Sequence, residues 1–125
     1  MATLNDKRRV EIVKLLSEAV DSMLEGIGSP QGLAVDTAVK EYAEQSDNEL
    51  ARAFEEEYVK AMDAATSDEP LDERRDALLR VAERINVPEV TTFANALIEA
   101  QYKQFSAVKT FQSQSEQLHQ KLSME

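Results

Sequence analysis

The sequence predicts an all-α protein, a compact antiparallel bundle of about six helices, and three observations lead to this fold class. Glycine and proline contribute only three residues each to the 125, whereas strong helix formers such as Ala, Leu, Glu and Gln are plentiful. Apolar residues recur at helical spacing along most of the chain, and no segment alternates as a β-strand would. A chain of this length forms one domain, residues 1–125.

The first helix is expected from about Asn5 or Asp6, either of which can cap it, to about Glu25. Gly26 and Gly28 end it, because glycine readily takes the left-handed conformation that closes helices. A broad apolar stripe makes this helix a buried one. The stripe consists of Val13, Leu16, Val20, Met23 and Leu24, widened by Val10, Ile12, Leu15 and Ala19.

Two further helices follow with recognisable start signals. Ser29-Pro30 opens the second, with serine as N-cap and proline at the first helical position, and this helix ends near Glu44. Ser46 and Glu49 have the spacing of a capping box and begin a third helix that reaches about Ala65. Its predicted inner face is Leu50, Phe54, Tyr58, Ala61, Met62 and Ala65.

A loop from Thr66 to Pro70 separates the third helix from a fourth over about Leu71–Ile85. Asn86 stops that helix, and Pro88 begins the fifth at a first-turn position. A looser region from Lys103 to Ser106 precedes the sixth helix. The apolar residues expected to face inward in these three helices are Leu78, Val81, Ala82, Ile85, Val90, Phe93, Ala94, Leu97, Ile98, Ala100, Val108, Phe111, Leu118 and Leu122.

The net charge of −10 is concentrated in one part of the chain. Residues 41–76 contain 13 acidic and 4 basic side chains, which is −9 of the total. This segment is either a solvated surface or a docking face for a basic partner, and Glu55, Glu56 and Glu57 are its candidate partner-binding residues. The same charge repels phosphate backbones, so we expect no nucleic-acid partner.

Lys7, Arg8 and Arg9 form a basic cluster near the start of the chain. No run of about 18 apolar residues and no signal peptide is present, so the chain itself is expected to be soluble. The cluster is therefore either ordinary helix surface or the membrane-proximal flank of a span that lies outside this chain.

The residues of the chain favour no enzymatic chemistry, so we expect no catalytic residue, cofactor or metal ion. Cysteine is absent, and His119 is the single histidine. Glu116 and His119 match half of a di-iron Glu-x-x-His pattern, but the second half needs another histidine. The glycines of Gly26-Ile27-Gly28-Ser29 lack the spacing of a phosphate loop and suit a helix end better. The run Glu55–Glu57 could hold a divalent cation loosely, although a solvated helix face explains it better.

The segment from Val81 to Phe93 has the rhythm of a helix-turn-helix motif. A recognition helix must bring basic and amide side chains to DNA. From Asn86 through Tyr102 there is no Lys or Arg, and there are two Glu. Reading of DNA through this motif therefore stays a minor alternative.

Three helical blocks between Ala77 and Leu118 follow one another in a specific order. Val81-Ala82-Glu83-Arg84 leads to the turn Val87-Pro88-Glu89-Val90, then to Glu99-Ala100-Gln101, and finally to Gln114-Ser115-Glu116-Gln117-Leu118. Without a gap, this stretch resembles the cytoplasmic domain of the type II secretion F family, most closely its tight-adherence (Flp) pilus platform branch. Gly26-Ile27-Gly28-Ser29, Ala38-Val39 and Leu50 to Phe54 resemble the earlier half more loosely. Asn86 replaces a usual Gly, and Lys103-Gln104 replaces a usual Leu-Gly.

The resemblance implies a non-catalytic scaffold domain at the cytoplasmic face of the bacterial inner membrane, excised from a polytopic platform protein for pilus assembly or type II secretion. Its expected partners are the assembly ATPase, a partner platform protein and further copies of itself. Membrane spans are then expected beside this domain in the parent protein. A soluble helical adaptor for protein–protein interaction is the alternative function, followed by the DNA-binding regulator.

Overall fold

The computed structural model describes residues 4–30, 32, 34–64, 70–103 and 106–123. All regular structure in these ranges is helical, which confirms the all-α prediction. The elements are α1 (Leu4–Ile27), α2 (Val35–Gln45), α3 (Glu49–Ala53), the π-helix η1 (Phe54–Val59), α4 (Lys60–Ala64), α5 (Pro70–Ile85), α6 (Pro88–Lys103) and α7 (Ala107–Ser123). Because α3, η1 and α4 are continuous, they form the single third helix that the sequence predicted.

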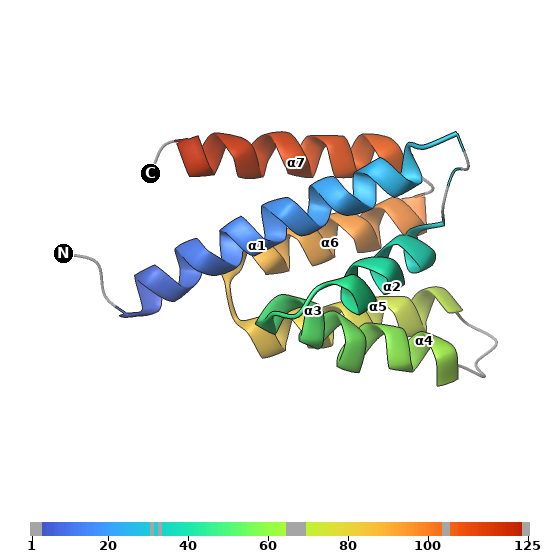
Figure 1. The fold of residues 1–125 in the computed structure, drawn as a ribbon. Helices are drawn as coiled ribbons and strands as arrows, with labels where there is room; N and C mark the ends of the chain where they lie inside the picture. Colours follow the sequence, from blue (N-terminus) through green and yellow to red (C-terminus); the bar gives the residue numbers. More distant parts are fainter. Residues whose placement is uncertain (1–3, 31, 33, 65–69, 104–105, 124–125) are drawn as a thin grey trace.

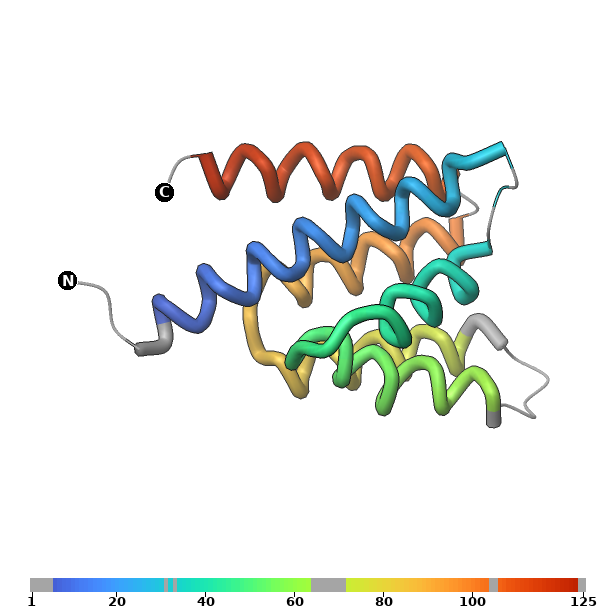
Figure 2. Tube along the Cα trace, in the orientation of Figure 1, coloured from blue at the N-terminus to red at the C-terminus, as the bar shows by residue number. Residues whose placement is uncertain are grey.

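The helices form two layers. In Figure 1, α1, α6 and α7 lie on one side of the molecule, and α2 to α5 lie on the other. α7 packs chiefly along α1, whereas α5 packs against α6 and the π-helix. The start of α1, the end of α7 and the corner between α5 and α6 all lie toward the same end of the bundle (Figure 2).

The core between the layers consists mostly of the residues that helical spacing predicted. Its largest fully buried side chains include Tyr58, Phe54, Phe93, Phe111, Leu16 and Met23. Two edge-to-face ring pairs, Tyr42 with Phe54 and Phe93 with Phe111, have centroids 6.2 and 5.6 Å apart. Six further residues that were predicted to face inward pack against this core but remain partly exposed: Leu24, Ala61, Met62, Ile98, Val108 and Leu122.

The predicted start of the second helix at Ser29-Pro30 is wrong. Ser29 instead closes α1, because its hydroxyl donates to the Gly26 carbonyl at 2.8 Å. Gly32 then takes a φ of +58°, which is incompatible with a right-handed helix. Helix α2 therefore begins only at Val35, and no side chain caps it.

The predicted capping box at the third helix is also wrong. Asn48 is the N-cap, and its Oδ1 accepts from the Ala51 amide at 2.8 Å. Ser46 ends the preceding helix, since its amide donates to the Tyr42 carbonyl. Asn and Ser are about equally good N-caps, so the choice depended on where α2 stopped.

The remaining boundaries fall close to those predicted. α1 begins at Leu4, which places Asn5 and Asp6 in its first turn instead of at the cap. α5 begins at Pro70, one residue before the predicted Leu71. Ala65, which was predicted to face inward, residues 66–69 of the predicted loop and residues 104–105 of the looser region before the last helix lie outside the described residues.

Asn86 takes the left-handed conformation that a helix stop requires, with a φ of +56°. Its amide closes the last turn of α5 by donating to the Ala82 carbonyl at 2.8 Å. Asn adopts this conformation more readily than most residues, and Gly does so without strain.

Replacing Asn86 with alanine is therefore expected to lower the free energy of unfolding by about 1 kcal/mol, whereas glycine should leave it nearly unchanged. Urea unfolding followed by circular dichroism measures both changes. Equal stabilities of the alanine and glycine variants would contradict the conformational explanation.

Candidate functional site

The acidic run in the π-helix is partly neutralised within the fold. Glu56 is exposed, whereas Glu55 and Glu57 are half-buried. Arg84 of α5 places Nη1 2.7 Å from Glu56 Oε2 and 3.3 Å from Glu57 Oε2, and Arg80 Nε lies 3.9 Å from Glu57 Oε1. Arg84 holds the pKa of Glu56 below its usual range by hydrogen bonding and by its charge. A basic partner docking on this run would compete with two arginines of the protein.

The π-helix also carries a partly buried polar network. The Tyr58 hydroxyl donates to Asp36 of α2, and Arg74 of α5 donates to the same carboxylate through Nε at 3.0 Å and Nη2 at 2.6 Å. Burial and the neighbouring Asp36 raise the pKa of Tyr58 far above its ordinary value. Tyr58 is therefore a fixed hydrogen-bond donor that holds the wide turn of η1 against α2. Beside it, the buried Oε2 of Glu55 has no hydrogen-bond partner among the described residues.

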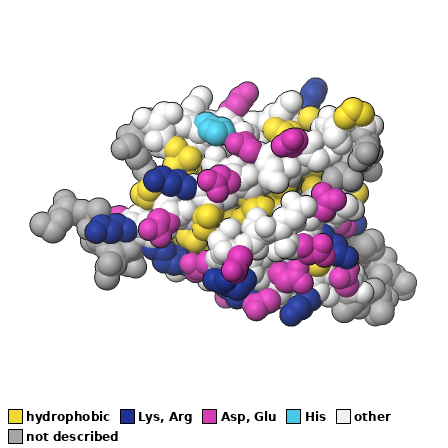
Figure 3. Space-filling model, in the orientation of Figure 1, with side chains coloured by type: hydrophobic (Ala, Val, Ile, Leu, Met, Phe, Trp, Pro, Cys, Tyr) yellow, Lys and Arg dark blue, Asp and Glu magenta, His cyan; other side chains and the backbone are white. Residues whose placement is uncertain are grey.

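Figure 3 shows acidic side chains, interspersed with Lys and Arg, across the face formed by α2 to α4. Glu41 and Glu44 of α2 are exposed, and neither forms an ion pair with another residue of the described ranges. These two glutamates, which the sequence did not single out, are more accessible to a basic partner than Glu55 or Glu57.

The residues of the predicted basic cluster mostly form contacts within the protein. Lys7 is exposed, but Arg8 donates from Nη1 to the Ile85 carbonyl at 2.9 Å and pairs through Nη2 with Glu49. The guanidinium thereby satisfies a carbonyl at the end of α5 while it joins α1 to the start of α3. Arg8 and Arg9 each have a carboxylate partner, whereas Lys7 forms no ion pair within the described residues.

Arg9 and Lys121 meet on one buried carboxylate, that of Glu89. The Glu89 side chain is 3% exposed, although it lies in the first turn of α6. Arg9 donates to it through Nε at 3.0 Å and Nη2 at 2.5 Å, and Lys121 Nζ donates at 2.9 Å. The Arg9 hydrogen bonds, followed by those from Lys121 and the Glu89 backbone, lower the pKa of Glu89 to about 2. One carboxylate therefore joins the beginning of α1, the beginning of α6 and the end of α7.

His119 lies on the surface of α7. Its Nε2 is 2.8 Å from Asp21 Oδ2 of α1, and Ser115 donates to Asp21 Oδ1 at 2.5 Å. The described residues contain no group of three His, Asp or Glu side chains placed to hold a metal ion. Among the helices of the described ranges, none is both long and apolar enough to cross a bilayer.

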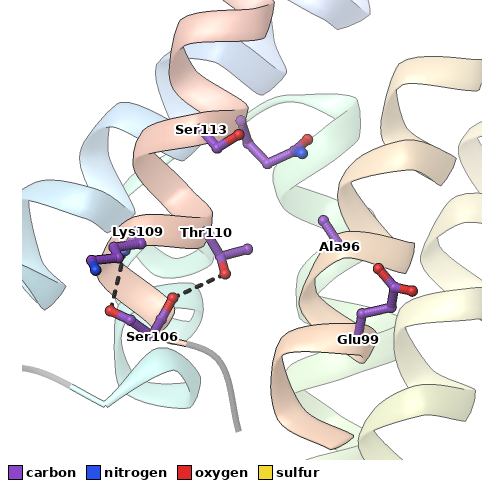
Figure 4. A pocket seen from close by; sticks show the side chains of 7 residues that line it. Ala96, Glu99, Ser106, Lys109, Thr110 and Ser113 are labelled. Atoms are coloured by element: carbon purple, nitrogen blue, oxygen red, sulfur yellow. Dashed lines mark hydrogen bonds between the residues drawn. The ribbon is translucent and has the colours of Figure 1, made fainter. Parts of the chain in front are cut away.

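An open groove of about 580 Å³ separates the C-terminal half of α6 from the N-terminal half of α7. Figure 4 shows Ala96 and Glu99 on the α6 side and Thr110 and Ser113 on the α7 side, with the Lys109 side chain directed away from α6. The side chains are small or polar, so the two helices do not interlock here. The groove is a surface feature without convergent reactive groups.

The chain matches no protein-family model, no curated protein and no solved structure. The resemblance to the platform family therefore rests on the sequence blocks between Ala77 and Leu118.

The sequence did not reveal the importance of Glu89 or Asp36. Glu89 lies 80 residues from Arg9 along the chain, and Asp36 lies 38 residues from Arg74. A signal was nevertheless present for Glu89. It is an acidic residue directly after a helix-starting proline, where the helix dipole favours negative charge.

Proposed function

We propose that this chain is a non-catalytic cytoplasmic scaffold domain of an inner-membrane platform protein for Flp-type pilus assembly or type II secretion. The observation that carries the proposal is the ungapped series of blocks from Ala77 to Leu118, centred on the turn Val87-Pro88-Glu89-Val90. The position of Glu89 supports the proposal, because the buried side chain of this turn residue joins three helices.

The position of the chain ends is consistent with attachment to one membrane surface. The start of α1 and the end of α7 lie at the same end of the bundle (Figure 1). Exposed Lys7 would lie there near anionic headgroups, as positively charged residues on the cytoplasmic side do. Arg8 and Arg9 would serve the fold more than the membrane, since both have carboxylate partners.

The acidic face of α2 to α4 is then the proposed docking surface for the assembly ATPase, with a partner platform subunit or a second copy as further contacts. ATPase motion would be relayed through the rigid bundle to the membrane segments. Exposed carboxylates suit such a contact, because charge complementarity steers association more than it sets final affinity.

Neutralising Glu56 and Glu57 together with glutamine is expected to weaken capture of the cognate assembly ATPase roughly three- to tenfold at low salt. Removing the carboxylates takes away attractive charge at the proposed contact. A pull-down with the purified ATPase measures the change, and circular dichroism confirms that helicity is retained. Neutralisation is preferable to lysine substitution, which would place like charges beside Arg84.

Arg84→Gln is the matched control for this double variant. It breaks both ion pairs of Arg84 but leaves the two carboxylates, and the longer Arg80–Glu57 pair, in place. Capture by this variant should equal or exceed that of the unaltered domain. Equal losses in the control and in the double variant would contradict docking through these carboxylates.

A further inference from the structure

Helix α7 is held to the rest of the protein unevenly. It packs along most of α1, but its contact with α6 is limited. The open groove occupies the side where α6 ends and α7 begins, and the Phe93–Phe111 ring pair joins the two helices farther along. Beyond these rings, the charged link from α7 to α6 is the bond from Lys121 to Glu89.

Glu89 binds the first and the last helix at the same time. Arg9 approaches from α1 with two nitrogen atoms, and Lys121 approaches from α7 with one. Both cations are about half exposed, whereas the carboxylate between them is buried. A buried charge that loses its partners is strongly destabilised, so the arrangement favours one closed state over partly open ones.

The other layer of the molecule does not depend on this carboxylate. Asp36, Tyr58 and Arg74 link α2, η1 and α5 through their own network. Arg84 adds an ion pair from α5 to η1. None of these contacts involves α1, α6 or α7, so the second layer has an independent set of polar restraints.

We propose that Glu89 is a conformational latch. While Arg9 and Lys121 both bind it, α7 is fixed on the corner where α6 begins. When Glu89 is released, the C-terminal half of α7 separates from α6 about the Phe93–Phe111 contact, and α2 to α5 keep their structure. The opening exposes Leu118 and Gln114, which lie between the rings and the latch and are buried in the closed state. The latch concerns the mechanics of the fold and does not depend on which partner the domain binds.

Amide hydrogen exchange on the full chain at neutral pH tests the latch, because a helix end that leaves its packing partner frays and its own amides then exchange faster. Glu89→Gln keeps the shape of the side chain but removes its charge. It is expected to speed exchange of the amides from Ser115 to His119 about tenfold or more, with the amides of α2 and α5 unchanged. Lys121→Gln should act on the same amides with a smaller effect.

Glu116→Gln is the matched control, since Glu116 is an exposed glutamate of α7 that lies away from the latch. It should leave the exchange pattern unaltered. A uniform increase over all helices in Lys121→Gln, or no increase in α7 for either latch variant, would overturn the proposal. If Glu89→Gln does not fold, Lys121→Gln decides the matter alone, because its lysine is half exposed and its removal leaves Arg9 on Glu89.

Discussion

Replacing Phe111 with alanine is expected to lower the free energy of unfolding by about 3–5 kcal/mol. The ring is completely buried, and its centroid lies 5.6 Å from that of Phe93 in an edge-to-face arrangement. The substitution removes apolar contacts, leaves a cavity and ends the ring pairing, which by itself contributes about 0.5–1.5 kcal/mol. Urea unfolding followed by circular dichroism measures the loss as a shift of the midpoint at unchanged slope.

Val108→Ala is the appropriate control for Phe111→Ala. Val108 lies on the same helix, three residues earlier, and is only partly buried. Its truncation should cost about 1 kcal/mol or less. Similar losses for the two variants would mean that Phe111 does not anchor α7 to the core.

Between about pH 4.5 and pH 2 the protein is expected to lose on the order of 2 kcal/mol of stability through Glu89 alone. The pKa of Glu89 is lowered from 4.5 to about 2 in the folded protein. Because the folded pKa is the lower one, the ionised carboxylate contributes its full stability above pH 4.5 and loses it as the pH falls through 2. The loss is smaller than the full change of pKa would give, because solvent partly screens the charges of Arg9 and Lys121.

Unfolding curves at several pH values between 6 and 2.5 isolate this contribution when the protein is compared with Glu89→Gln. The variant should be less stable at pH 6, and the difference should shrink as the pH falls. Glu99→Gln, which alters an exposed pair with Lys103, should follow the unaltered protein throughout. A constant difference between Glu89→Gln and the protein across this range would refute the assignment.

Helical periodicity was sufficient to predict the fold class, because the spacing of apolar residues that marks the buried side of a helix can be seen within each segment of the sequence. The helix ends were harder to predict. Ser29 and Ser46 each have a hydroxyl that can serve either the helix before it or the helix after it, and in both cases the serine belongs to the earlier one. Which of the two helices the serine belongs to depends on the backbone path of the whole segment. The left-handed conformation of Gly32, for example, prevents a helix from starting at Ser29-Pro30.

The π-helix was not predicted, because the apolar spacing of Phe54 and Tyr58 also suits an ordinary α-helix. Its wide turn brings Val59 into the core together with Tyr58. The polar contact that accompanies it comes from Asp36, on a different helix.

The candidate site residues were predicted from local charge, and local charge does not reveal long-range pairing. The runs Lys7–Arg9 and Glu55–Glu57 are obvious in the sequence, yet most of their members have partners on distant helices. Glu89 is a single acidic residue with no neighbouring charge of either sign within three positions, and it proves to be the most connected carboxylate described.

The pairing of the first helix with the last also constrains how the protein can fold during synthesis. α1 has its most extensive packing with α7, which is synthesised after all the other described helices. At a synthesis rate of about 5–20 residues per second, the apolar face of α1 lacks its main packing partner for on the order of ten seconds. During this interval, Val13, Leu16 and Val20 have only α2 and the middle of the chain to cover them. The nascent chain therefore depends on α2 to α5 forming a provisional core until α7 has been synthesised and packs against α1.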